Sequence, residues 1–237
     1  MTNVARKRAS YASPAILARR ARILELTREL IGEQGLGGFS VSELGHRANV
    51  AKQTIYNIFQ TKERMIATAI NEYFEQREEE IRYRSPQGTM ERMIERTMVA
   101  GLRGARMPNY MAALMTIYFS PEPDADIWAA VQRSTVHGHK PWIERLSGEG
   151  RLQSWVRPQV LIDDLALMRN AITFEWSRGR IGIEEALRRK VVGLLTGIAG
   201  SVREPVRGEV EVRLEEIDRN GLPDYRPPPD RSGPQAG

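Results

Sequence analysis

Two short predicted helices, joined by a tight turn at Asn49, most constrain how this chain can fold. The first follows Ser40 and ends near Ala48, and the second extends from Lys52 to Phe59. Asparagine tolerates the left-handed backbone that such a turn requires. Helices of this length are not stable alone in water, because too few hydrogen bonds follow the unfavourable first turn. They therefore need longer helices before and after them to cover their apolar faces.

Local signals place the limits of this four-helix unit. Ser40-Val-Ser-Glu43 has the pattern of a capping box. Ser13-Pro14 predicts the start of a preceding helix that ends at Gly35, and Lys62 opens a long helix that follows. The residues predicted to form the small core are Ile23, Leu30, Phe39, Val41, Leu44, Ala48, Val50, Ile55 and Phe59.

The other periodic segments before residue 200 also have helical spacing, so the sequence predicts an all-α protein. Proline and glycine clusters separate them. Their predicted limits are Gly88–Arg106, Asn109–Phe119, Ala125–Leu146, Pro158–Arg178 and Glu184–Ala199. Residues 203–237 are rich in proline, and we expect a largely disordered tail there, apart from a short strand that the alternation over Val210–Leu214 would allow.

The positive charge is confined to the first quarter of the chain. Residues 1–62 contain ten Lys and Arg against four Glu, whereas residues 63–237 contain 25 against 26 acidic residues. This asymmetry fits either a polyanionic partner for the N-terminal part or a solubilising surface, and charge alone does not separate the two.

Composition and hydropathy exclude several classes of protein. The chain has no cysteine, which rules out disulfides, a thiolate nucleophile and cysteine-ligated metals. Its longest apolar stretches, Met111–Phe119 and Val191–Ala199, are about half as long as a bilayer span requires. Residues 1–20 lack the apolar run of a secretory signal. We therefore expect a soluble, cytoplasmic protein with no membrane partner.

The outward side of the second short helix carries an unusual set of polar residues. Its amides, hydroxyls and lysine can hydrogen-bond to base edges or phosphates. Helix-turn-helix proteins present such a surface to the major groove of duplex DNA, as two-fold dimers on inverted half-sites. The residues are Lys52, Gln53, Thr54, Tyr56 and Asn57.

The stretch Ala18–Ala69 resembles the DNA-binding domain of the tetracycline-repressor (TetR, AcrR-type) family of transcriptional regulators. The most specific likeness is the spacing of Thr54, Tyr56, Phe59 and Lys62. The further points of likeness are Ile23-Leu24, Gly35, Ser40-Val41, Leu44, Ala48-Asn-Val50, Ile55, Glu63 and Met65.

The resemblance implies a role for each residue of the polar surface. Lys52 and Gln53 would face base edges, since lysine donates to guanine and glutamine pairs with adenine. Thr54 and Tyr56 would hold backbone phosphates, and Tyr56 could also touch a thymine methyl or simply pack against the first helix. Asn57 is equally consistent with a DNA contact and with a solvated position.

The resemblance also implies DNA contacts outside that helix. Lys62 would bind a phosphate where its charge and the amides of a helix N-terminus act together. Ser40 and Ser42 would contact the opposite strand. The chain departs from the family where Ala51 replaces a Ser or Thr cap and where Gly45 replaces an alanine, which should loosen its helix slightly.

The last two helices of the predicted body are candidates for a dimer interface. Each carries two apolar faces, one for the monomer core and one for a partner, although a single intramolecular core would show the same pattern. The resemblance implies an intermolecular four-helix bundle. The stripe assigned to the interface is Leu161, Leu165, Met168, Ile172, Leu187, Val191, Leu194 and Ile198. A second stripe beside it is Val160, Leu167, Ala171, Phe174, Val192 and Leu195.

A region rich in Met and aromatic residues precedes these helices. It predicts an adaptable apolar ligand pocket, with most of its residues in ordinary core. The residues assigned to the pocket are Met98, Tyr110, Met111, Met115, Tyr118 and Trp128. His137-Gly-His139 has no third ligand at a clear spacing, so we expect a surface loop there rather than a metal site. No metal and no cofactor are predicted.

Three classes of function were compared. The first is a homodimeric repressor that binds a palindromic operator in double-stranded DNA and is released by a small apolar or aromatic ligand. The second is a ligand-independent or architectural DNA binder. The third is an all-helical enzyme, but the chain has no Gly-x-Ser-x-Gly, Walker or His-Glu-x-x-His motif.

The first class is predicted, as a non-enzymatic protein associated with the nucleoid. Its expected parts are a basic arm (1–13), a DNA-binding domain (14–79) with its helix-turn-helix at about 39–59, a helical effector-binding and dimerisation domain (80–202) and the tail (203–237).

Overall fold

Residues 14–225 are described by the structure, which is a computed structural model. They form eleven α-helices and no strand, with one isolated bridge between Leu152 and Val202. The prediction of an all-α protein is therefore confirmed. None of these helices is both long enough and apolar enough to cross a membrane. The basic arm and Ser13, the predicted first cap, lie outside the described residues.

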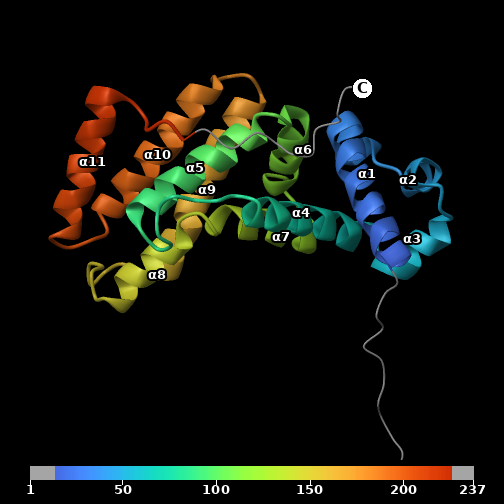
Figure 1. Ribbon diagram of the computed structural model, residues 1–237, viewed down its shortest axis with the longest axis horizontal. Coiled ribbons are helices and arrows are strands. Elements are labelled where there is room, and N and C mark those ends of the chain that lie inside the picture. The colour runs from blue at the N-terminus through green and yellow to red at the C-terminus, as the bar shows by residue number, and fades with distance from the viewer. Residues whose placement is uncertain (1–13, 226–237) are drawn as a thin grey trace, which may run out of the picture.

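Three helices form a head at one end of an elongated molecule, as Figure 1 shows. They are α1 (Pro14–Gly38), α2 (Val41–Ala48) and α3 (Lys52–Phe59). The next helix, α4 (Lys62–Glu79), leaves the head and runs into the body, where it packs along α7 (Ala125–Val136). The predicted positions of α2 and α3 are confirmed.

The predicted core explains why such short helices are ordered in the head. Asn49 has φ 51° and ψ 48°, the left-handed conformation expected at the turn. Gly35 has φ 68° and interrupts α1 where the sequence predicted its end. Two predicted core residues, Ala48 and Val50, are partly buried against the core. The others are at most 6% exposed: Ile23, Leu30, Phe39, Val41, Leu44, Ile55 and Phe59.

Five further helices complete the body around two apolar clusters. They are α5 (Met90–Gly104), α6 (Pro108–Tyr118), α8 (Lys140–Gly148), α9 (Pro158–Ser177) and α10 (Ile183–Ala199). The first cluster starts in the head and continues through α4, α6 and α7. The second lies among α5, α8, α9 and α10. Because α1 packs directly on α6, head and body share one apolar core.

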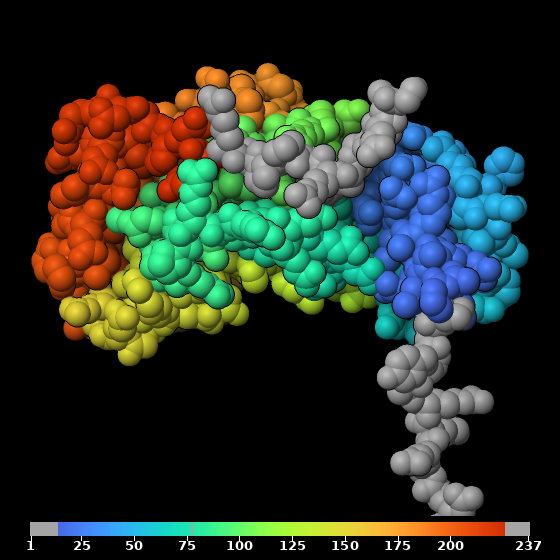
Figure 2. All heavy atoms as spheres, viewed as in Figure 1, coloured from blue at the N-terminus to red at the C-terminus, as the bar shows by residue number. Residues whose placement is uncertain are grey.

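Two predictions about the helices are corrected. The segment expected as one helix over Ala125–Leu146 is divided between α7 and α8 by a turn at residues 137–139. The expected disorder after residue 203 is wrong for α11 (Val206–Asn220), which packs on α10. Figure 2 shows α11 at the end of the molecule opposite the head.

The segment is helical because its alternating apolar residues also contain a helical spacing. Val210 and Ile217 are seven residues apart, which places them on the same face of a helix. Both are at most 1% exposed and belong to the second cluster. The strand expected over Val210–Leu214 is therefore helical. Pro205 precedes α11 and Pro223 follows it, so neither removes a hydrogen bond from its interior.

Truncating Ile217 tests whether α11 is docked. Ile217→Ala should lower the free energy of unfolding by about 2–5 kcal/mol, because it leaves a cavity in the core. Val212→Ala, on the same helix, should change it by less than about 0.5 kcal/mol, because Val212 is 56% exposed. Urea unfolding followed by circular dichroism measures both. Equal effects of the two variants would contradict the docking of α11.

Candidate nucleic-acid interface and cavities of the body

The outward side of α3 is a continuous polar face. Lys52, Gln53 and Asn57 are exposed, whereas Thr54 and Tyr56 are half-buried. Gln53 Nε2 donates to Asn57 Oδ1 at 3.0 Å, and the Lys52 ammonium lies 5.9 Å from the centre of the Tyr56 ring. All five residues predicted for this surface therefore lie on one helix, and their contacts with DNA stay a prediction.

The two helices of the motif are capped differently. No side chain caps α3 at Ala51, as the sequence predicted. Ser40 caps α2, where its Oγ accepts the Glu43 N–H at 3.5 Å. The capping box is confirmed only in this half, because the Glu43 carboxylate bonds to Gln34 and Arg47 instead.

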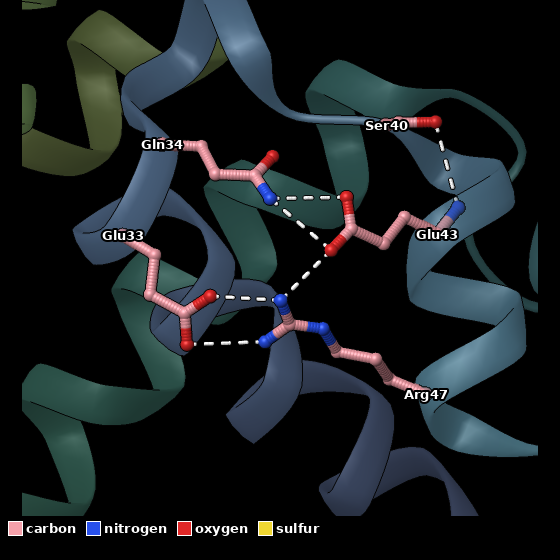
Figure 3. Close-up of polar contacts among 5 residues, drawn as sticks. All are labelled: Glu33, Gln34, Ser40, Glu43 and Arg47. Atoms are coloured by element: carbon pink, nitrogen blue, oxygen red, sulfur yellow. Dashed lines mark hydrogen bonds and ion pairs between the residues drawn. The ribbon is translucent and has the colours of Figure 1, made fainter.

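That carboxylate belongs to a network joining α1 to α2, which Figure 3 shows. Gln34 Nε2 donates to the two Glu43 oxygens at 3.0 and 3.1 Å. Arg47 lies 2.8 Å from both Glu43 and Glu33. The hydrogen bond from Gln34, followed by that from Arg47, lowers the pKa of Glu43. Exposed pairs each stabilise little, so the network mainly fixes the position of α2 against α1.

Gly45 has a packing role that helix propensity does not predict. It is buried, and a Cβ atom at this position would lie 2.9 Å from the carbonyl oxygen of Val50. The Val50 N–H in turn donates to the Gly45 carbonyl at 2.9 Å. Gly45 thus allows α2 to approach the turn closely, which corrects the view that it only loosens the helix.

Lys62 ties the start of α4 to the loop before α2. Its Nζ donates to the Phe39 carbonyl at 3.1 Å and lies 5.3 Å from the centre of the Phe39 ring. Ser42 is exposed and Ser40 is half-buried at the start of α2. Lys62 therefore has a structural contact in the head besides the phosphate contact that the resemblance implies.

The stripe assigned to the dimer interface is mostly internal, which corrects that assignment for five residues. Each is at most 5% exposed and packs in the second cluster: Leu165, Leu187, Val191, Leu194 and Ile198. The other three, Leu161, Met168 and Ile172, are half-buried. Of the second stripe, Val160, Leu167 and Ala171 lie on the exposed side of α9, Val160 and Leu167 each 49% exposed, whereas Leu195 is fully buried.

The residues assigned to the ligand pocket do not surround one cavity. Tyr110, Met115 and Tyr118 are buried in the first cluster and Met111 packs against it, whereas Met98 lies in the second cluster. Trp128 is exposed and stacks on Tyr118, with ring centres 5.5 Å apart. Most of this Met- and aromatic-rich region is ordinary core, as expected.

Two adjoining cavities lie elsewhere, beside the C-terminal part of α4. One, of about 270 Å³, is open to solvent on one side and is lined by α4, the loop after it, the start of α5 and the α7–α8 turn, with Trp142 in its wall. The other, of about 280 Å³, lies between α4 and α7 and is lined by Phe74. Both are lined by Glu78, Arg96 and His137. None of the six predicted pocket residues lines either cavity.

The turn His137-Gly-His139 is not the surface loop expected. His139 is fully buried, and its Nε2 donates to the Ile162 carbonyl at 2.8 Å. Burial and then the charge of Arg169 lower the pKa of His139 to about 3, so the ring is neutral at physiological pH. Within residues 14–225, no three His or acidic side chains are grouped as metal ligands.

Three buried cations lie behind this turn. Arg169 Nη1 donates to the Thr135 carbonyl at 2.8 Å, near the C-terminal end of α7. Burial and then the charge of Arg96 lower the pKa of Arg169 to about 9. Lys190 is 7% exposed, and burial and then Arg169 lower its pKa to about 7. The sequence missed this cluster, because its members come from three different helices.

Head, turn and polar α3 face together define a helix-turn-helix DNA-binding protein with a larger helical body. The family model for bacterial regulatory proteins of the tetR family (TetR_N) matches residues 23–77. The match shows that the N-terminal domain of this chain is of the TetR type. No curated protein sequence matches the chain.

Solved structures share the fold over most of the chain. A TetR transcriptional regulator from Rhodococcus sp. RHA1 is 19% identical, with a TM-score of 0.56, and covers 76% of this chain and 96% of its own. Thermus thermophilus FadR, a TetR-family transcriptional repressor solved with lauroyl-CoA, is 18% identical, with a TM-score of 0.54. The match covers 78% of this chain and 96% of FadR. A TetR regulator from Agrobacterium tumefaciens is 16% identical, with a TM-score of 0.52. The match covers 81% of this chain and 98% of the regulator.

The buried lysine makes stability depend on pH. Its pKa of about 7 in the folded chain lies below the ordinary value of 10.5, so the unfolded state binds more protons between these values. Wild-type stability should therefore rise as the pH increases from 7 to 10.5. Lys190→Met should raise the free energy of unfolding by a few kcal/mol below pH 7 and by progressively less above it.

Guanidinium unfolding at about pH 6 and about pH 10 measures this difference. Lys140→Met is the control, because the side chain of Lys140 is 43% exposed. A gain for Lys190→Met that does not change with pH would contradict a buried ammonium at this position.

Proposed function

We propose that this protein is a homodimeric transcriptional repressor that binds a palindromic operator through α3 of each copy and is released by a small molecule. It acts in the cytoplasm at the nucleoid, by binding rather than by catalysis. The observation that carries the proposal is the polar face of α3. Lys52, Gln53 and Asn57 are exposed, whereas Tyr56 packs partly against the core that fixes the helix in place. Exposed hydrogen-bonding groups on a fixed helix are what reading of base edges requires.

Within this proposal, Lys52 and Gln53 contact bases near the start of α3, with Asn57 bonded to Gln53 beside them. Thr54 and Tyr56 contact the DNA backbone. Phosphate contacts would come also from Lys62 and from the serines at the start of α2. The excess of basic residues before residue 63 supports attraction to the DNA backbone.

The partner face would be the exposed side of α9 and α10. Val160 and Leu167 are seven residues apart, so they share one helical face, and both are large apolar residues exposed to solvent in the single chain. Burying such a face against a second copy removes it from water. A two-fold dimer places two α3 helices on successive turns of the duplex.

Ligand release would act through α4. This helix contacts the head at Lys62 and packs along α7 in the body, beside both cavities. A ligand that binds more tightly when the heads are spread lowers the affinity of the protein for its operator. Bound operator lowers the affinity of the protein for the ligand by the same factor. The structural neighbour FadR was solved with lauroyl-CoA, which supports a ligand-responsive role for this fold.

Two substitutions in the head distinguish contacts with DNA bases from contacts with DNA phosphates. Gln53→Ala should relax the preference at one base position by about 1–3 kcal/mol, because it removes a bidentate contact. Lys62→Ala should weaken binding to all sequences and reduce the salt slope by about one, because it removes a phosphate contact. Operators selected from a random pool, titrated by fluorescence anisotropy at several salt concentrations, measure both effects.

Circular dichroism must show a folded head in Lys62→Ala, since Lys62 also bonds to Phe39. Equal losses of Gln53→Ala on every base variant would remove Gln53 from the base-reading set. Wild-type protein that binds random and selected DNA equally would favour an architectural binder over a repressor.

A charge on the exposed α9 face should prevent dimerisation. Leu167→Asp is expected to yield monomers, because two copies would bury opposing carboxylates in an apolar interface. Val212→Asp is the control, since Val212 is similarly exposed but lies on α11. Sedimentation velocity distinguishes monomer from dimer. A dimer that persists in Leu167→Asp would place the interface elsewhere.

A further inference from the structure

We propose that the 270 Å³ cavity lined by α4, α5 and the α7–α8 turn binds a small organic anion, which pairs with Arg92 and Arg96 and takes the place of Glu78 on Arg96. The inference rests on the proposed ligand-responsive function and names the chemical class of its ligand. The anionic group is a carboxylate or a phosphate monoester, attached to a compact apolar group.

The wall of the cavity formed by α5 is positively charged. Arg92 and Arg96 are one helical turn apart, so their side chains share one face, and both line the 270 Å³ cavity. Arg96 is 8% exposed. Nη1 of Arg92 is buried and has no hydrogen-bond partner within residues 14–225. Two like charges on one face repel unless an anion lies between them.

Further positive charge lies directly behind the wall. Arg169 Nη1 would be 2.8 Å, and Arg96 Nη1 2.9 Å, from a Cβ atom placed on Gly138. Gly138 itself lines the cavity, so the guanidinium of Arg169 lies close behind this part of the lining. Thr89 at the N-terminal cap of α5 also lines the cavity, where the helix dipole adds partial positive charge.

In the 270 Å³ cavity, the nearby carboxylates do not balance these cations. Glu95 is buried, but its two oxygens accept the backbone N–H groups of Arg84 and Ser85, each at 2.9 Å. Glu78 is the acidic residue that lines the cavity, and its Oε2 lies 2.8 Å from Arg96 Nε. Buried cations require anions close by, and one carboxylate from α4 faces at least two guanidinium groups.

The remainder of the ligand would be apolar and small. Met93 and Trp142 line the same cavity as the arginines, and Phe74 lines the adjoining 280 Å³ cavity. The two cavities share Arg96, so a ligand bound to it can extend into either one. An aromatic or short aliphatic group of about ten carbon atoms fits such volumes, which lie just below the usual range for ligand pockets.

The exchange on Arg96 would couple the cavity to the head. Glu78 lies in the last turn of α4, and Lys62, at the start of the same helix, bonds to Phe39 in the head. An anion that displaces Glu78 breaks the ion pair between α4 and α5 and frees this end of α4 to move. The intact pair therefore corresponds to the DNA-binding state.

The test is direct titration of the full-length protein, without DNA, by isothermal calorimetry. The probes are benzoate, octanoate and phenyl phosphate, compared with neutral benzamide. At least one anion should bind saturably and at least about tenfold more tightly than benzamide. Comparison of benzoate with phenyl phosphate identifies the anionic group. If no anion binds more tightly than benzamide, the proposal is wrong.

Three variants locate the site. Arg92→Met should weaken anion binding at least about tenfold, whereas Arg207→Met, on α11, should not, because its side chain is exposed and remote from the cavity. Glu78→Gln should strengthen it, because the competing carboxylate is removed. Unchanged affinity in both Arg92→Met and Glu78→Gln would overturn the proposal. Arg92 is only half-buried and Glu78→Gln keeps the side-chain shape, so both variants are expected to fold.

Operator binding is measured separately on the same variants. Glu78→Gln should lower operator affinity about fivefold or more without any added anion. Anion binding by a protein that binds no operator would leave the site in place and reject the proposed repressor. Operator binding with no preference for anions would reject the site and leave the repressor.

Discussion

The apolar cluster that passes from the head into the body is the constraint on which the rest of the structure depends. The two short helices of the head cannot fold without it, and α4 and α6 supply the surface that α1 covers. The polar face of α3 is therefore held by contacts that begin in the body. Any shift of α4 against α7 must be transmitted to the head, because both ends of α4 are packed against other elements.

A second constraint is the excess of positive charge inside the body. Arg96, Arg169 and Lys190 are all less than 9% exposed, and water solvates none of them fully. The carbonyl of Thr135 and the neutral ring of His139 contact Arg169, and Glu78 contacts Arg96. Such an arrangement is less stable than an apolar interior of the same shape. Its retention is understandable if the charges select what enters the cavity.

The sequence predicted the head well because its signals are local. Turn residues such as Asn49 and Gly35 act through their own backbone angles, and the α3 face follows from helical spacing alone. The body was predicted only as helices. Which stripe of α9 and α10 faces the core depends on partners far along the chain, and both stripes have the same spacing. The cavity beside Arg92 was missed for the same reason.

The unbroken packing between head and body has a practical consequence for dissecting the protein. A fragment that ends after α4 would expose the apolar side of α1 that α6 covers and the side of α4 that α7 covers. Such a fragment would tend to aggregate or to lose the order of its recognition helix. The proposed DNA recognition and ligand response would thus be properties of one cooperative folding unit, and exchanging heads between relatives would require redesigning the contact between head and body as well.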